Sequence, residues 1–250
     1  MHKTTDPSCH IDPSVQLSTG VDIGYHVTIM ADASVGEGSR IGHNVVIYPG
    51  TKIGREVTIY DNTVIGRQPQ SAGNLARPLK SDLAPIQIGS YSVIGACAVL
   101  YAGTTIGEHV LVSDLCSVRE ECVIEDFVVL GRGVILNYDV HVGKKTRIMD
   151  QSHITGKCRI GEDCFISVLV GTTNENNMLL GKELIIEGPT IGDRARLGVG
   201  VNVLPGKSIG KDSIVSAASL VSTDIPEGVL AAGVPARVIR DNPFLNRKSR

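Results

Sequence analysis

A six-residue repeat runs through most of this 250-residue chain. Every sixth residue is Ile, Leu or Val over residues 11–65, again over 88–166, and again over 191–221. A period of six matches neither the 3.6-residue period of a helix nor the two-residue alternation of a half-buried strand. It is typical of an all-β parallel β-helix, in which three hexapeptides form one triangular coil of 18 residues and the aliphatic side chains stack in its interior.

Composition agrees with a narrow aliphatic interior. Aromatic residues make up only 4% of the chain, Trp is absent and Gly is frequent, with 28 residues. The fourth position after each repeated aliphatic residue carries a small side chain, and Cys116, Cys122, Cys158 and Cys164 occupy this position. We interpret these cysteines as small apolar fillers with free thiols rather than as metal ligands, because whole coils separate them and no Cys-x-x-Cys pair is present.

Two segments carry no repeat, residues 67–87 and 173–190. Long irregular excursions from a rigid scaffold are usually functional, so we expect both to form loops at the site. We assign residues 1–226 to the β-helix domain and residues 227–250 to a short C-terminal cap and tail, with the stretch 233–240 as the cap.

Stacking identifies one corner of the solenoid as a candidate site. Residues 18 apart lie above one another, so Asn174 is predicted to lie over Gly156, and Gly156 over Tyr138. The second loop departs at this corner, and Gly156 leaves room for a ligand. Asn137 and Asp139 flank the column. The alternative is that the corner is polar only because it faces solvent.

Net charge and hydropathy limit the classes of partner that the sequence predicts. The net charge of −2 gives no indication of nucleic-acid binding. The N-terminus has no apolar signal region and no apolar run approaches ~18 residues, so we expect no membrane segment and a cytoplasmic location.

Among the histidines, His141 and His153 are 12 residues apart and therefore fall on different faces, which excludes a shared metal within one subunit. His153 is nearest the column and is a candidate for substrate contact. In the first loop, Arg67, Arg77 and Lys80 are candidates for binding a diphosphate, since guanidinium groups bind phosphate oxygens in a planar fork. A solvated polar loop is the alternative.

Two motifs carry a family resemblance. The C-terminal sequence LGVGVNVLPGKSIGKDSIVSAASLVSTDIPEGVLAAGVPARVIR resembles that of the hexapeptide-repeat acyltransferases. The segment TTNENN, followed by a loop and GPTIGDRARLGVG, resembles the N-acetyltransferases of nucleotide-linked amino sugars, especially those acting on dTDP-3-amino-3,6-dideoxyhexoses.

The resemblance implies a left-handed coil, a homotrimer, no metal and acetyl-CoA bound in a groove between two subunits. By this match, the pantetheine arm would pass small residues of the later coils, and two cations would contact the CoA phosphates. The small residues are Gly198, Gly200, Ala217 and Ala218, and the cations are Lys211 and Arg237.

The resemblance also bears on catalysis. Related sugar 4-N-acetyltransferases have a His where this chain has Tyr138, and the 3-N-acetyltransferases lack it. A neutral sugar amine can attack a thioester without a strong base, because simple amines titrate near ~7.7–8.0. We therefore predict that Asn174 and Glu175 hold the amine, with Asn137 and Asp139 as supports, while a backbone N–H stabilises the oxyanion.

Four other functions stay open at this point. A 4-amino sugar is an alternative acceptor within the same family. An O-acetyltransferase would need a real base for a hydroxyl. A hexapeptide carbonic anhydrase would need three zinc-binding histidines. A non-catalytic β-helix subunit would explain the repeat but not the two loops.

Overall fold

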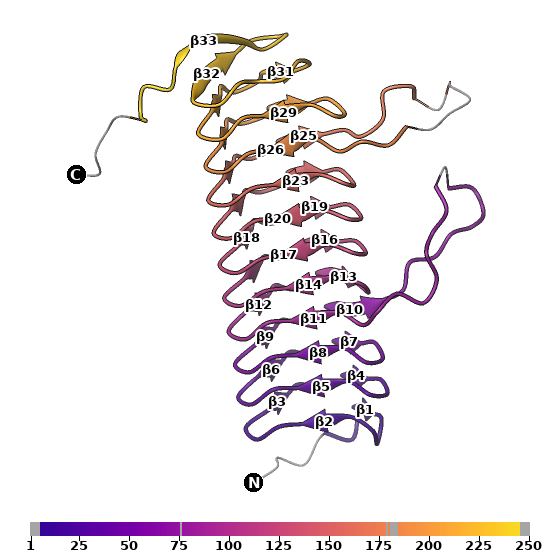
Figure 1. Ribbon diagram of the computed structural model, residues 1–250. Coiled ribbons are helices and arrows are strands. Elements are labelled where there is room, and N and C mark those ends of the chain that lie inside the picture. Colours follow the sequence, from indigo (N-terminus) through magenta and orange to yellow (C-terminus); the bar gives the residue numbers. More distant parts are fainter. Residues whose placement is uncertain (1–5, 76, 179, 181–184, 246–250) are drawn as a thin grey trace.

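The chain folds into a left-handed parallel β-helix, which confirms the predicted fold class. The computed structural model describes residues 6–75, 77–178, 180 and 185–245, and none of these residues lies in an α-helix. Each coil is a triangle with one short strand on each side (Figure 1). Strands 18 residues apart pair in parallel, so that Ile11 lies beside Ile29 and Ile29 beside Ile47.

The three sides of the triangle stack into three sheets, which within the described residues contain 11, 10 and 12 strands and are here named A, B and C. Sheet A contains β1 (His10–Ile11), β4 (Thr28–Ile29), β7 (Val46–Ile47), β10 (Val64–Arg67), β13 (Val99–Tyr101), β16 (Ser117–Val118), β19 (Ile135–Leu136), β22 (His153–Ile154), β25 (Gly171–Thr172), β28 (Asn202–Val203) and β31 (Leu220–Val221). Sheet B contains β2 (Gln16–Leu17), β5 (Ser34–Val35), β8 (Lys52–Ile53), β11 (Gln87–Ile88), β14 (Thr105–Ile106), β17 (Val123–Ile124), β20 (His141–Val142), β23 (Arg159–Ile160), β26 (Thr190–Ile191) and β29 (Ser208–Ile209). Sheet C contains β3 (Asp22–Ile23), β6 (Arg40–Ile41), β9 (Thr58–Ile59), β12 (Val93–Ile94), β15 (Leu111–Val112), β18 (Val129–Leu130), β21 (Arg147–Ile148), β24 (Phe165–Ile166), β27 (Arg196–Leu197), β30 (Ile214–Val215), β32 (Val229–Ala232) and β33 (Arg237–Asp241).

The interior is the aliphatic column that the period predicts. Repeated residues such as Ile29, Leu100 and Leu136 are fully buried, and each contributes roughly 1.5–3 kcal/mol through burial. The cysteine fillers are buried as well, and burial raises the pKa of the Cys122 and Cys158 thiols to about 12. These thiols therefore stay protonated and act as packing groups.

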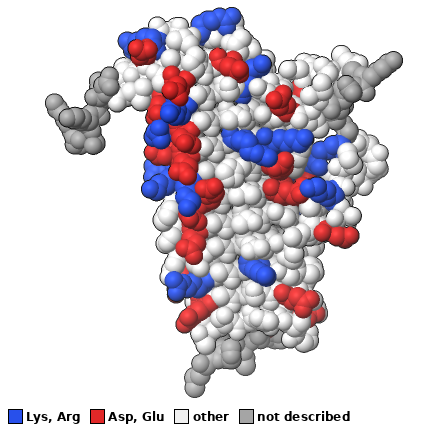
Figure 2. Space-filling view, in the orientation of Figure 1, with Lys and Arg blue, Asp and Glu red and all other residues white. Residues whose placement is uncertain are grey.

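Three corners join the sheets, and the corner that follows sheet A, here called corner A/B, carries the predicted column. Corner A/B includes the turns 101–103, 119–121, 137–139, 155–157 and 173–175. Corner B/C follows sheet B, and Figure 2 shows its charged side chains along the left edge of the solenoid. Charges of corner B/C pair with one another, as in Arg194–Asp212 at 2.7 Å and Lys144–Asp126 at 3.5 Å. Corner C/A follows sheet C and includes the turns 198–200 and 216–218.

Two loops leave the solenoid at corner A/B, close to the predicted bounds. The first loop, residues 68–86, connects β10 to β11, and the second loop, residues 173–189, connects β25 to β26. Both leave the same side of the solenoid (Figure 1). Paired hydrogen bonds between Gln68 and Leu83, at 2.9 and 3.2 Å, close the base of the first loop.

Two strands near the C-terminus extend sheet C beyond the last coil. β32 continues sheet C in parallel with β30, and β33 folds back antiparallel on β32. The predicted cap at 233–240 thus covers the turn and most of β33. In the part of the chain that the structure describes, no helix is long and apolar enough to cross a membrane.

Candidate functional site

The three residues of the predicted column share corner A/B and touch one another. The Asn174 amide nitrogen Nδ2 lies 3.2 Å from the Tyr138 hydroxyl and 3.2 Å from the Gly156 carbonyl oxygen, and it donates to both. A Cβ at position 156 would lie 2.5 Å from the Tyr138 ring. The space that Gly156 leaves is therefore filled by Tyr138 rather than left open for a ligand.

The amide of Asn174 has a defined orientation. A backbone carbonyl only accepts hydrogen bonds, so the bond to the Gly156 oxygen requires the amide nitrogen on that side. The amide oxygen Oδ1 then faces away, and no donor contacts it among the described residues. Oδ1 of this half-buried side chain is an available acceptor at the root of the second loop.

The first loop reaches the same column through Arg77. Its guanidinium carbon lies 3.5 Å from the centre of the Tyr138 ring, and its Nη2 forms an ion pair with Glu120. Glu120 is 2% exposed, and Arg119 provides a second partner at 3.1 Å. A buried carboxylate is stable only when it is paired, so two guanidinium groups account for Glu120 in this corner.

The structure distinguishes the three cations predicted for the first loop. Arg77 is committed to Glu120, and Lys80 is paired with Glu121. The guanidinium of Arg67 lies 5.2 Å from the centre of the Tyr101 ring, and no acceptor contacts it within the described parts of the chain. Within the part of the chain that the structure describes, Arg67 is thus a half-buried cation of this corner whose N–H donors are available to an anion.

Two of the remaining predicted acceptor residues, Glu175 and Asp139, already have side-chain partners in the protein. The Glu175 carboxylate accepts from the backbone N–H groups of Asn177 and Met178, and so caps a turn of its own loop. Asp139 pairs with Arg159 at 2.7 Å. The half-buried Asn137 lies one residue from Tyr138. Direct roles for Glu175, Asn137 and Asp139 stay predictions.

His153 lies beside corner A/B on the outer face of sheet A. It pairs in the sheet with Ile135 and Gly171, whereas His141 lies in sheet B, as the spacing predicts. Partial burial of the imidazole lowers the pKa of His153, although the residue as a whole is exposed. Its imidazole is therefore neutral at pH 7.

The residues predicted to bind CoA fall into two groups. Gly198, Gly200, Ala217 and Ala218 form a small-residue surface at corner C/A. Gly200 has a φ of +66° and open space where a Cβ would be. Arg237 follows Ala236, whose N–H donates to Leu220 just beyond this corner. Lys211 is separate, because it lies at corner B/C and pairs with Glu227 at 3.6 Å.

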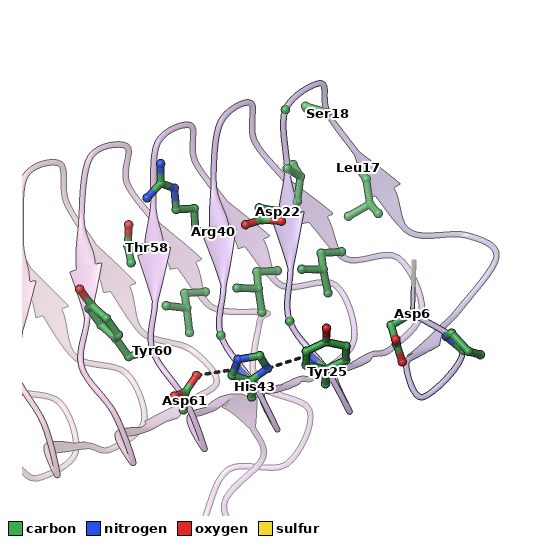
Figure 3. Close-up of a pocket in the computed structure, with 18 residues that line it drawn as sticks. Asp6, Leu17, Ser18, Asp22, Tyr25, Arg40, His43, Thr58, Tyr60 and Asp61 are labelled. Carbon is green, nitrogen blue, oxygen red and sulfur yellow. Dashed lines mark hydrogen bonds between the residues drawn. The ribbon is translucent and has the colours of Figure 1, made fainter. Parts of the chain in front are cut away.

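A groove of about 1230 Å³ lies far from the loops, over the N-terminal coils. Figure 3 shows His43 between Tyr25 and Asp61 in this groove. The Tyr25 N–H donates to His43 Nδ1 at 2.9 Å, and the His43 N–H donates to Asp61 Oδ1 at 2.6 Å. Both side chains therefore serve the backbone of neighbouring coils. In the described residues, no group of three His, Cys, Asp or Glu side chains is arranged to hold a metal ion.

Sequence reasoning missed Glu120, Arg119 and Tyr101. Their shared corner with Tyr138 was visible in the 18-residue stacking, but the contact of Glu120 with Arg77 joins residues 43 apart across an irregular loop. The stacking rule does not extend to such a contact.

Comparison with known proteins identifies the family. The model for "Bacterial transferase hexapeptide (six repeats)" matches residues 32–67, and that for "Hexapeptide repeat of succinyl-transferase" matches residues 188–222. The galactoside O-acetyltransferase of Escherichia coli is 31% identical over 142 residues, which cover 49% of this chain and 68% of that protein. The chain belongs to the hexapeptide-repeat acyltransferase superfamily.

Other relatives match over shorter shares. The bifunctional protein GlmU of Rubrobacter xylanophilus is 33% identical over 42% of this chain, which spans 21% of that protein. The galactoside O-acetyltransferase of Lactococcus lactis is 32% identical over 46% of this chain, which spans 54% of that protein. Among solved structures, LpxA from Acinetobacter baumannii aligns with 95% of this chain and 74% of its own, at a TM-score of 0.49 and 21% identity.

Proposed function

We propose that this protein transfers an acetyl group from acetyl-CoA to the amino group of a nucleotide-linked sugar, a dTDP-linked 3-amino-dideoxy sugar in the first instance. The family supports acyl transfer from a CoA thioester. The TTNENN segment, through its family resemblance, supports the amino-sugar acceptor. The observation that carries the proposal is the Oδ1 of Asn174 at the root of the second loop, which no donor contacts among the described residues.

The chemistry of Asn174 favours an amine over a hydroxyl. An amide oxygen accepts a hydrogen bond and thereby orients an N–H group, but it does not take up a proton at neutral pH. A sugar amine with a pKa near ~7.7–8.0 is partly neutral at cellular pH and needs only positioning. The amine nitrogen attacks the thioester carbonyl carbon, the C–N bond forms, the C–S bond breaks, and the CoA thiolate or water receives the amine proton.

Arg67 is the proposed anchor for the diphosphate. Its guanidinium at the base of the first loop, which no acceptor contacts among the described residues, offers a planar fork to phosphate oxygens. The neighbouring Tyr101 gives this cation a fixed aromatic support. The nucleotide would then lie along the first loop, with the sugar directed toward Asn174.

The small-residue surface at corner C/A is the proposed CoA path. The turn 198–200 leads into β28, and β28 pairs with β25, which ends next to Asn174. The two sites therefore lie on neighbouring coils, on opposite edges of sheet A. The side of the triangle between the two sites has six residues and spans at most ~20 Å. An extended CoA arm that crosses this distance brings the thioester to the amine. Alternatively, CoA bound at the same surface of a neighbouring subunit supplies the thioester. We propose a homotrimer, which light scattering in solution would test.

O-acetyl transfer is the second candidate, because the galactoside relatives are O-acetyltransferases by name. It needs a base, and the neutral imidazole of His153 is the available one beside the corner. A panel of dTDP-linked 3-amino, 4-amino and hydroxy sugars, assayed by release of CoA thiol, separates the candidates. We expect turnover with a 3-amino sugar and none with its hydroxyl analogue. Turnover with the hydroxyl analogue alone would contradict the proposal.

A further inference from the structure

Tyr138 contacts both loops at once. Arg77 of the first loop lies over one face of its ring, and Asn174 of the second loop donates to its hydroxyl. Gly156 lies against the ring, within the distance at which a Cβ would collide. Tyr138 is therefore held by three contacts that come from different parts of the chain.

The contact of Arg77 with Tyr138 depends in turn on Glu120. The guanidinium of Arg77 is fixed by its ion pair with this buried carboxylate, and Arg119 shares the same carboxylate. In a weakly solvated corner, a cation over an aromatic ring is worth more than on an exposed surface. A continuous path of contacts thus runs from Glu120 through Arg77 and Tyr138 to Asn174.

We propose that the first loop positions the acceptor-binding amide of the second loop: docking of Arg77 on Glu120 holds Tyr138 in place, and Tyr138 holds Asn174. Arg77 and Glu120 are positioning residues in this account, and the acceptor site is complete only when the first loop is docked. The inference rests on the proposed function for the meaning of Asn174, but the coupling itself is a property of the free protein.

Hydrogen exchange of the free protein tests the coupling without any substrate. The backbone N–H of Glu187 donates to the Asn174 carbonyl at 2.9 Å and reports on the root of the second loop. In Arg77→Ala we expect exchange at Glu187 to become about five- to thirty-fold faster. Arg67→Ala is the matched control, because Arg67 contacts Tyr101 instead of Tyr138, and it should leave Glu187 unchanged.

Two further measurements distinguish loss of the coupling from misfolding of a variant. The N–H of Asn137 donates to Ile154 at 2.8 Å within the coils, and its exchange should be the same in every variant. Glu120→Gln should also make hydrogen exchange at Glu187 faster, as Arg77→Ala does, because it removes the charge that holds Arg77. Unchanged exchange at Glu187 in both variants, with intact coils, would overturn the proposal.

Coupling is reciprocal, so the second loop must also act on the first. Asn174→Ala should raise the rate of tryptic cleavage after Lys80 of the first loop by a similar factor, while cleavage after the exposed Arg132 stays constant. If exchange and cleavage respond as expected but no amino sugar is acetylated, the coupling stands and the proposed function fails. If amino sugars are acetylated and neither readout responds, the coupling fails alone.

Discussion

The groove over the N-terminal coils and corner A/B between the two loops differ in what their polar atoms contact. In the groove, His43 and Asp61 accept hydrogen bonds from backbone N–H groups of neighbouring coils, and the charged Arg40 is exposed (Figure 3). At corner A/B, Glu120 is buried between two arginines, and no donor of the described residues contacts the Oδ1 of Asn174. The polar side chains of the groove therefore bond to the solenoid backbone, whereas the charged corner A/B is where we propose that the acceptor binds.

Removing the free acceptor should have the largest effect. Asn174→Ala should lower kcat/KM for acetyl transfer about 10²–10³-fold, the usual loss for one preorganised polar contact to the reacting centre. Asn44→Ala is the matched control, since Asn44 lies on the N-terminal coils and its amide nitrogen donates to Asn62 at 3.3 Å. If steady-state kinetics show unchanged activity in Asn174→Ala, the acceptor site is not at Asn174, and corner A/B no longer differs in function from the groove.

Removing the free cation should have the next largest effect. Arg67→Ala should raise KM for the nucleotide sugar roughly 10- to 100-fold with little change in kcat, because a charge-assisted bond is worth about 1.5–3 kcal/mol. Arg40→Ala removes an exposed cation from the groove and should change neither constant. A stronger effect for Arg40→Ala would assign the phosphates to the groove.

Glycine substitutions separate packing from function in the two regions. Gly156→Ala places a methyl group 2.5 Å from the Tyr138 ring and should displace it, which we expect to lower kcat about tenfold. Gly42→Ala places a methyl group 2.4 Å from Asp61 Oδ1, at the groove. Both variants should lower Tm, but Gly42→Ala should keep its kcat once folded, as thermal melts and kinetics would show.

The smallest expected effect is that of His153 on the pH dependence of kcat/KM. Since burial lowers the pKa of His153, its imidazole is already neutral above pH 6.5. Its titration therefore adds no rise to the profile of kcat/KM above that pH. We expect kcat/KM to rise with a single limb near ~7.7–8.0, set by the substrate amine. The same limb should persist in His153→Asn. A limb below pH 6.5 that disappears in His153→Asn would identify an imidazole base and favour hydroxyl acceptors.

The stacking rule explains which features were predictable from the sequence. The six-residue period determines the coil, and the 18-residue spacing places Tyr138, Gly156 and Asn174 in contact. It does not determine how a side chain fills the space above a glycine, so the filling of the Gly156 site by Tyr138 became visible only in the structure.

The contacts of the two loops could not be predicted from the stacking rule. Residues 68–86 have no period, and the contact of Arg77 with Glu120 follows from a path that sequence spacing does not encode. Likewise, Glu175 is one residue from Asn174, yet its carboxylate turns to Asn177 and Met178 within the loop. Short-range hydrogen bonds of this kind compete with any role toward a ligand.

A footprint of dTDP on the intact protein compares the two regions most directly. Hydrogen exchange with and without saturating dTDP should show protection in the first loop around Arg67 and in the second loop around Asn174, and none at Tyr25, His43 or Asp61. Protection of the N-terminal groove with unchanged exchange in both loops would contradict the assignment of the nucleotide-sugar site to corner A/B.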